Sequence, residues 1–379
     1  MERKISILGS TGSIGQQTLN VAKNLGEKVK VYGLAAKSNV DLIELQAIET
    51  GAEIVCLFDE KAAKELKKRH PMWNVVTGMS GLCEVASYHA VDTVIAATVG
   101  SLAILPVMEA IKAKKMIGLA NKEILVAAGH FITKLAKEMN VTLFPIDSEH
   151  SAIFQCLLGE DKESVSKVVL TASGGPFLHF SEEQLKHVTA KDSANHPTWS
   201  MGSKVSIDCS TLMNKGFEVI EAKWLFDLPL EKIDVVIHPQ SLVHSFIEFI
   251  DGSMKAQINV PNMELPIQYA LTYPKREKRG TLPFDFYKNN KFEFFTPDRK
   301  KFRCLDLAYE SLRVGGSLPC VLNAGNEVLV ERFCRGEVSW MGIAEKLEIL
   351  LGRHNALYDL SVDTLLEVDR EARLEAKRL

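Results

Sequence analysis

A glycine-rich segment near the start of the chain, Gly9 to Gly15 (GSTGSIG), constrains the fold more than any other feature. It lies between an apolar run, Lys4 to Leu8, and a stretch in which apolar residues recur at helical spacing. A second apolar run, Lys30 to Ala35, follows. Glycines at such a strand-to-helix turn let the backbone approach a pyrophosphate, whose charge the helix N-terminus stabilises. The segment therefore predicts a β-α-β unit that binds a dinucleotide. Because its spacing is G-x-x-G-x-x-G and not G-x-G-x-x-G, a glycine-rich turn that binds nothing stays an alternative.

The residues after the second apolar run indicate which dinucleotide binds. A site for NAD normally carries an acidic residue about 20 positions beyond the glycines, where it binds the ribose 2′-hydroxyl. Here the chain reads Lys37-Ser38-Asn39, with no acid. A cation beside small polar groups suits a 2′-phosphate, so NADP is favoured over NAD. The alternative is that Lys37 is a solvated surface lysine.

Further apolar runs alternate with segments of helical period up to about residue 147, a pattern typical of a parallel sheet with helices on both faces. The expected strands are Ile54 to Phe58, Thr93 to Ala97, Met116 to Leu119 and Val141 to Ile146. The prediction is an α/β fold: a Rossmann-like NADPH-binding domain at 1–147, a central α+β catalytic domain at 148–273, a connector at 274–301 and a small C-terminal helical bundle at 302–379. Thr364 and Glu367 form a candidate capping box in that bundle.

Size and composition exclude several classes of protein. A length of 379 residues exceeds what one hydrophobic core usually serves. The net charge of −3 gives no reason to expect nucleic acid as a partner. No apolar stretch reaches the roughly 18 residues of a membrane span, and the charged start leaves no room for a signal or transit peptide. The 7 cysteines include no C-x-x-C pair, so we expect a reducing bacterial cytoplasm and no disulfide framework.

Polar groups follow two further predicted strands. Asn121-Lys122-Glu123 comes after one of them, and ligands bind outside the carboxyl ends of parallel strands. Asn121 is expected to bind the nicotinamide ribose and Lys122 a substrate oxygen, unless the segment only starts a helix. Asp147 and Glu149 follow the last run, and in an extended chain both carboxylates point to one side. Such a pair favours Mg²⁺ or Mn²⁺ over zinc, although most acidic pairs are simply solvated.

Three later segments add groups suited to a phosphorylated substrate. Ser173 to Phe177 (SGGPF) offers a hydroxyl and backbone amides to an anion. His196 to Gly202 (HPTWSMG) is predicted to be a loop that closes over a substrate and excludes water. Asn214, Lys215 and Glu218 supply an amide, a cation and a third carboxylate. For each segment the structural alternative is a capped turn or a packed aromatic.

The motifs GSTGSIG, LANKE, PIDSEH, SGGPF, HPTWSMG, MNKGFEVIEA and HPQSLVHS occur in this chain in the order found in the 1-deoxy-D-xylulose 5-phosphate reductoisomerase family, which the whole chain resembles. The resemblance implies rearrangement and reduction of 1-deoxy-D-xylulose 5-phosphate to 2-C-methyl-D-erythritol 4-phosphate in the non-mevalonate isoprenoid pathway. It implies NADPH and a divalent metal as cofactors, Mg²⁺ or Mn²⁺ with Co²⁺ as a further candidate. It also implies that the protein is a homodimer and that its substrate is a small sugar phosphate.

The resemblance also implies roles for single residues. NADPH would be bound by Thr11, Gly12, Ser13, Ile14, Lys37, Ser38, Asn39, Asn121, Glu123 and Gly202. The metal ligands would be Asp147, Glu149 and Glu218. The substrate would contact Lys122, Ser148, Glu149, Ser173, His196, Cys209, Asn214, Lys215 and Glu218. Lys122 and Glu149 are the candidates for proton handling, and Trp199 and His238 match positions at the mouth of the site.

Two positions depart from the family pattern. Cys209 stands where a serine often donates to the substrate phosphate, and cysteine is the weaker donor. Either Ser210 compensates, or the phosphate relies more on Ser173, Asn214 and Lys215. Gly325 stands where alanine is usual, and we expect it to affect only local helix stability.

Two other functions are alternatives to this one. A metal-independent NADP-dependent dehydrogenase of the semialdehyde class would attack its substrate through a cysteine, but no cysteine here lies in a recognisable nucleophile motif. An NADP-sensing binding module would need neither the carboxylates nor the phosphate-binding segments.

Overall fold

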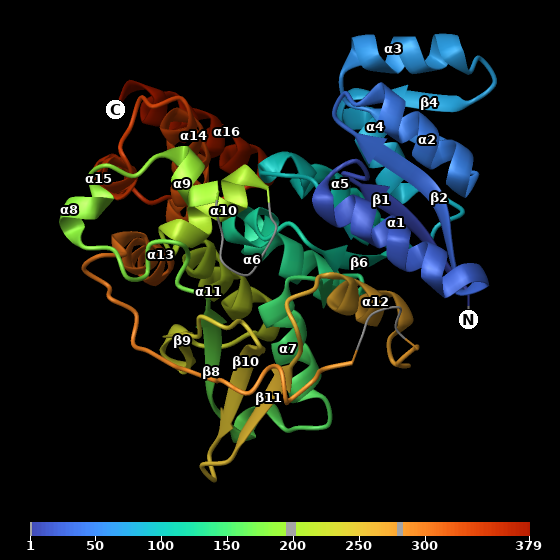
Figure 1. Ribbon diagram of the computed structural model, residues 1–379. Coiled ribbons are helices and arrows are strands. Elements are labelled where there is room, and N and C mark those ends of the chain that lie inside the picture. Colours follow the sequence, from blue (N-terminus) through green and yellow to red (C-terminus); the bar gives the residue numbers. More distant parts are fainter. Residues whose placement is uncertain (1, 195–201, 279–282) are drawn as a thin grey trace. The chain divides into compact units, whose positions relative to one another are not determined.

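The computed structural model describes residues 2–194, 202–278 and 283–379 (Figure 1). The chain forms two compact units. The first contains residues 1–124, 130–151 and 262–283, and the second contains residues 125–129, 152–261 and 284–379. Each unit has its own sheet.

The first unit is built on a seven-stranded sheet with the order β4-β3-β2-β1-β5-β6-β7. Its strands are β1 (Arg3–Leu8), β2 (Val29–Ala36), β3 (Ile54–Leu57), β4 (Asn74–Thr77), β5 (Thr93–Ala96), β6 (Met116–Leu119) and β7 (Leu143–Pro145). All neighbouring strands run parallel, which confirms the predicted α/β fold. The strand that the sequence did not predict, β4, lies at the edge of the sheet, where one of its residues is exposed and the other three are only partly buried.

Helices cover this sheet, and the first of them follows the glycine-rich segment directly. They are α1 (Ser13–Leu25), α2 (Val40–Thr50), α3 (Glu60–Arg69), α4 (Gly78–Ser87), α5 (Ile104–Lys112) and α12 (Glu264–Thr272). Two longer elements, α6 (Glu123–Glu138) and α7 (Ser148–Leu157), follow β6 and β7. Although α12 comes late in the sequence, it packs against α1, β6 and β7. Because the strands are parallel, the glycine-rich segment after β1 and the polar segments after β6 and β7 lie at the same end of the sheet.

The second unit contains a four-stranded sheet with the order β11-β10-β8-β9. Its strands are β8 (Val165–Ala172), β9 (Ile233–Ile237), β10 (Val243–Phe249) and β11 (Met254–Ile258). β8 pairs parallel with β9 and antiparallel with β10, so the sheet is mixed, as expected of an α+β domain. β8, β10 and β11 lie side by side in Figure 1.

Helices complete the second unit, and those after residue 302 form the predicted C-terminal helical region. The helices are α8 (Glu182–Leu185), α9 (Ala190–Ala194), α10 (Ser203–Ser210), α11 (Met213–Phe226), α13 (Arg303–Val314), α14 (Leu318–Cys334), α15 (Trp340–Arg353) and α16 (Val362–Arg378). α11 packs against α13, and α14 packs against both α15 and α16. Buried apolar residues of β8, α11, α13 and α14 belong to one hydrophobic core.

One expectation about this helical region was wrong. The cap of α16 is Ser361, whose side chain accepts a hydrogen bond from the Thr364 amide at 3.1 Å, so the helix begins before the predicted capping box. A Cβ on Gly325 would lie 2.4 Å from Leu350 Cδ2, the end of a flexible side chain that can move aside.

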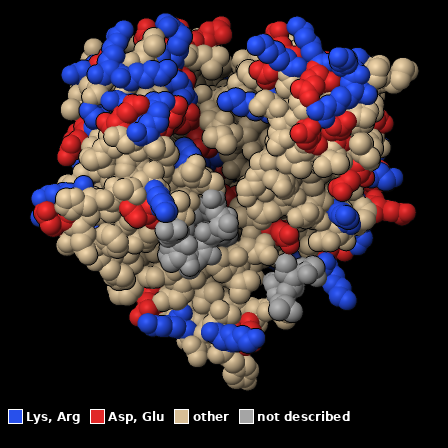
Figure 2. Space-filling model, turned by 45° about the horizontal axis from the view of Figure 1, so that its top comes forward, with Lys and Arg blue, Asp and Glu red and all other residues tan. Residues whose placement is uncertain are grey.

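The surface shows no segregation of charge on the face in Figure 2, where basic and acidic side chains are interspersed. Among the described residues, no helix is long and apolar enough to cross a membrane.

Candidate functional site

The glycine-rich loop is held tightly against the ends of β2 and β5. Gly9 has a φ of 89°, and a Cβ there would lie 2.5 Å from the Ala97 carbonyl oxygen. A Cβ on Gly15 would lie 2.2 Å from the Gly9 carbonyl oxygen, so both positions require glycine for packing. Gly12 is exposed and is the N-cap of α1. Because it has no side chain, it leaves the first amides of the helix open to an anion, an arrangement that fits a pyrophosphate.

A residue that sequence reasoning missed supports this loop from behind. Gln46 on α2 is 5% exposed, and its Nε2 donates to the Ser10 carbonyl oxygen at 3.0 Å. The Gly9 and Ser10 amides donate to the Ala35 carbonyl oxygen at 2.8 and 2.9 Å. Gln46 shares the buried side of α2 with Val40 and Ala47, so a polar residue within an apolar stripe was the available signal.

The segment predicted to bind the 2′-phosphate follows β2 directly. Lys37, Ser38 and Asn39 are all exposed. Asn39 is the N-cap of α2, and its Oδ1 accepts a hydrogen bond from the Leu42 amide at 3.1 Å. A cation and donors at a helix N-terminus suit a phosphate.

Asn121 and Lys122 connect neighbouring strand ends. Asn121 is 3% exposed, and its Nδ2 donates to the carbonyl oxygens of Thr98 and Gly100 at 2.6 and 2.8 Å. Its side chain therefore shapes the loop after β5. Lys122 Nζ lies 2.6 Å from Asp147 Oδ2, which joins the end of β6 to the end of β7. Glu123 is the first residue of α6 and is buried.

The acidic segment after β7 has a different backbone from the one expected. α7 begins at Ser148, so Asp147 precedes the helix and Glu149 lies in its first turn. The expectation of an extended segment was therefore wrong, yet oxygens of the two carboxylates lie within 4.8 Å of each other. The Ser148 hydroxyl donates to Glu149 Oε2 at 2.6 Å. Paired oxygen ligands beside a lysine fit a divalent cation such as Mg²⁺.

In the second unit, the start of α11 gathers a buried carboxylate and its partners. Glu218 is 1% exposed and forms an ion pair with Lys215, which is 3% exposed. Asn214 Nδ2 donates to Glu218 Oε1 at 2.6 Å. The Leu212 backbone has a φ of 59° and separates α10 from α11. These neighbours supply the partners without which a buried carboxylate would be strongly disfavoured.

The two segments assigned to the substrate phosphate contact each other. Ser173 follows β8, and its hydroxyl accepts a hydrogen bond from the Gly175 amide at 3.2 Å. A Cβ on Gly175 would lie 2.7 Å from the Cys209 carbonyl oxygen. Ser210 is wholly buried, donates to the Ile207 carbonyl oxygen at 2.7 Å and accepts from a tryptophan. Its hydroxyl therefore does not replace the one that Cys209 lacks.

Other predicted residues lie elsewhere. His196 and Trp199 fall outside the described residues, and Gly202 is the exposed N-cap of α10. His238 is wholly buried: its Nδ1 donates to the Glu293 carbonyl oxygen at 2.9 Å, and its Nε2 accepts from the Leu242 amide at 3.1 Å. Burial lowers the pKa of His238. This histidine anchors the connector and does not line an open surface.

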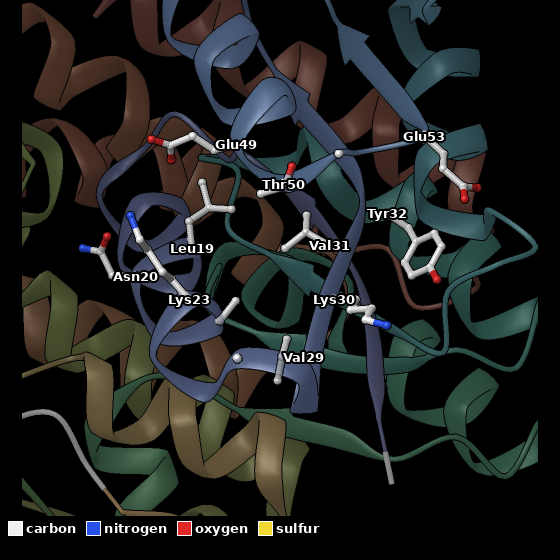
Figure 3. Close-up of a pocket in the computed structure, with 13 residues that line it drawn as sticks. Leu19, Asn20, Lys23, Val29, Lys30, Val31, Tyr32, Glu49, Thr50 and Glu53 are labelled. Atoms are coloured by element: carbon white, nitrogen blue, oxygen red, sulfur yellow. The ribbon is translucent and has the colours of Figure 1, made fainter.

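A separate hollow of about 540 Å³ lies between α1, β2 and α2 (Figure 3). Its floor includes Val29 and Val31, and its rim carries Lys23, Glu49 and Glu53. It lies at the beginning of β2, whereas the predicted cofactor residues follow the ends of the strands. The hollow is therefore not the dinucleotide site.

A parallel sheet with a glycine-lined helix N-terminus defines a Rossmann-type dinucleotide-binding fold. Comparison with known proteins specifies the class further. Family models for 1-deoxy-D-xylulose 5-phosphate reductoisomerase match residues 5–129, those for its C-terminal domain match residues 143–226, and a DXP reductoisomerase C-terminal domain matches residues 258–375.

Similar proteins span the same length. The chain is 56% identical to the 1-deoxy-D-xylulose 5-phosphate reductoisomerase of Protochlamydia amoebophila, over 99% of this chain and 98% of that protein. It is 50% identical to that of Acetivibrio thermocellus, with 98% of both covered. The solved Zymomonas mobilis enzyme in complex with NADPH superimposes with a TM-score of 0.93 at 36% identity, covering 100% and 99% of the two chains. The chain belongs to the 1-deoxy-D-xylulose 5-phosphate reductoisomerase family and is an oxidoreductase.

Proposed function

We propose that this enzyme rearranges and reduces 1-deoxy-D-xylulose 5-phosphate to 2-C-methyl-D-erythritol 4-phosphate, using NADPH and a divalent metal. The observation that carries the proposal is the N-terminus of α1, which Gly12 leaves open to an anion. In the same chain, Asp147 is paired with Lys122 and Glu218 with Lys215. A solved relative, 38% identical over 99% of this chain, is a complex with NADPH, fosmidomycin and magnesium. Mg²⁺ is therefore the first candidate, with Mn²⁺ and Co²⁺ as alternatives.

The cofactor is bound by the strand ends of the first unit. Thr11, Gly12, Ser13 and Ile14 present the loop and the first turn of α1 to the pyrophosphate. Lys37, Ser38 and Asn39 bind the 2′-phosphate and exclude NADH. Asn121, Glu123 and Gly202 complete the nicotinamide side, Asn121 by fixing the loop at Thr98 and Gly100.

The metal is bound by Asp147, Glu149 and Glu218. Three carboxylates exceed what the neighbouring lysines neutralise, and oxygen-only ligands suit Mg²⁺. A bound ion would polarise the carbonyl and hydroxyl oxygens of the substrate. Lys122 and Lys215, which pair with two of these carboxylates, then become available to the substrate.

The remaining side chains bind the sugar phosphate. Ser173, Cys209, Asn214 and Lys215 bind its phosphate group, and Lys215 supplies the charge that a weak thiol donor does not. Ser148 and His196 contact the sugar. Lys122 and Glu149 move protons at the reacting oxygens, since Lys122 can donate a proton where Glu149 can accept one.

The enzyme is a homodimer in the cytoplasm. β11 is the edge strand of its sheet and exposes Met254 and Ile258 by 52% and 41%. An edge with exposed apolar side chains favours pairing with another strand, and a second copy of this chain is the proposed partner. The cysteines are free, as a reducing compartment requires.

The loss of NADPH absorbance on addition of 1-deoxy-D-xylulose 5-phosphate and Mg²⁺ tests the proposal. Turnover should stop when a chelator removes the metal and resume when Mg²⁺, Mn²⁺ or Co²⁺ is added in excess. Turnover that ignores the chelator would favour the metal-independent dehydrogenase. Binding of NADPH without any turnover would favour the sensing module.

A further inference from the structure

One side chain of the C-terminal helices touches both segments assigned to the substrate phosphate. Trp340, the first residue of α15, is 4% exposed. Its Nε1 donates to the Ser210 hydroxyl at 3.0 Å. Its ring meets that of Phe177 edge to face, with centroids 5.9 Å apart and an interplanar angle of 86°. Ser210 ends α10, and Phe177 belongs to the SGGPF loop, so Trp340 bridges the two.

A second side chain of these helices fixes the same part of α10. Asn326 on α14 is wholly buried and donates from Nδ2 to Asp208 Oδ1 at 2.8 Å. Asp208 is 1% exposed, and its other oxygen lies 2.8 Å from Lys204 Nζ. Asp208 directly precedes Cys209. The residue in the serine position is thus flanked by Asp208 and Ser210, and each of these is held by a C-terminal helix.

The packing leaves little room for this segment to shift by itself. Gly175 approaches the Cys209 carbonyl so closely that a Cβ would lie 2.7 Å away. A movement of the end of α10 would therefore displace the loop that carries Ser173. Lys301 also holds this loop, because its ammonium group donates to the Leu178 carbonyl oxygen at 2.9 Å.

We propose that Trp340 and Asn326 are positioning residues for the phosphate group of the substrate. They act through Ser210 and Asp208, and neither belongs to the proposed binding set. The inference rests on the proposed function, which assigns Ser173 and Cys209 to the phosphate. Because a thiol donates weakly, phosphate binding in this chain depends strongly on where the remaining donors are held.

Trp340→Phe tests the role of the hydrogen bond, because it keeps an aromatic ring beside Phe177 and removes the indole N–H together with part of the ring system. The KM for the sugar phosphate should rise about three- to ten-fold, the size expected for one neutral hydrogen bond. The kcat and the KM for NADPH should stay as they are. Ser210→Ala should raise the same KM, since it removes the acceptor of the Trp340 hydrogen bond as well as the Ser210 bond to the Ile207 carbonyl. The double variant should be no worse than Ser210→Ala alone, because the Trp340 bond is already lost in that variant. Additive effects would overturn the proposal.

Asn326→Leu and Asn323→Leu form a matched pair on α14. Both asparagines are wholly buried, but Asn323 donates to Glu327 Oε1 at 3.1 Å and not to α10. Only Asn326→Leu should raise the KM for the sugar phosphate, with thermal unfolding recorded for both. Equal KM values in the two variants would mean that these residues only stabilise the fold.

Lys215→Met separates this inference from the proposed function. If Lys215→Met raises the KM for the sugar phosphate while Trp340→Phe and Asn326→Leu do not, the positioning roles are wrong and the phosphate site stands. If Lys215→Met leaves that KM unchanged, the assignment of the phosphate site itself is wrong.

Discussion

The two units place their functional residues by different means. In the first unit, Gly12, Lys37 and Lys122 lie in short segments that follow the ends of strands, so the backbone of a local motif sets their positions. In the second unit, the residues next to Cys209 are held by Asn326 and Trp340, which lie 118 and 130 positions from their partners. A local motif therefore sets most of the proposed cofactor loop, with Gln46 of α2 as a support from outside the motif. The proposed phosphate site depends more on distant packing.

The largest effect is expected where the metal binds. Asp147→Asn keeps the size of the side chain but removes a charge, so turnover should fall by at least about 100-fold, the upper cost of losing even an outer-shell partner of a metal ligand. The dissociation constant for NADPH should hardly change, because the glycine-rich loop is untouched. Glu49→Gln, a change to an exposed carboxylate of the same unit, is the control and should turn over normally. Normal turnover by Asp147→Asn at low Mg²⁺ would mean that the carboxylates at Asp147 and Glu149 are solvated and bind no metal.

A smaller effect is expected at the 2′-phosphate. Lys37→Asp replaces an attraction by a repulsion, so the preference for NADPH over NADH in kcat/KM should shrink about 10- to 100-fold. Lys23→Asp makes the same change at an exposed site on α1, beside the hollow in Figure 3, and should leave the preference intact. Equal use of NADPH and NADH by the unmodified enzyme would contradict the assignment.

The smallest effect sharpens the contrast between local and distant support. Gln46→Leu removes the bond to the Ser10 carbonyl, and the KM for NADPH should rise about five-fold, as for one neutral hydrogen bond. Gln268→Leu on α12 removes a comparable bond to the Glu277 carbonyl oxygen and should leave this KM unchanged. An unchanged KM in Gln46→Leu would mean that the glycines alone hold the loop.

Much of the first unit could be predicted because its signals are local. Strand ends and the glycine-rich loop lie in continuous stretches of sequence. The alternation of strands with helices predicted that the strands run parallel. The edge strand β4 escaped because its residues are only partly buried. The role of Gln46 was not predicted, because a single glutamine on a helix belongs to no motif and only the fold brings it to Ser10.

Less of the second unit could be predicted, because its contacts join distant segments. The sequence left open whether Ser210 compensates for Cys209, and the answer depends on Trp340 and the backbone of α10. His238 matched a position at the mouth of the site, yet the fold buries it against the connector. A Cβ on Gly325 would contact Leu350 of α15, a neighbour that the sequence pattern does not reveal.

Direct binding of Mn²⁺ tests the central claim, that Asp147, Glu149 and Glu218 ligate one divalent ion. The free Mn²⁺ signal in electron paramagnetic resonance would be followed while the unmodified enzyme, Asp147→Asn and Glu218→Gln are titrated in turn, each with NADPH present. One tightly bound ion per chain is expected in the unmodified enzyme, and a severe loss of affinity is expected in both variants, partly overcome at high Mn²⁺. Unmodified affinity in either variant would contradict this claim.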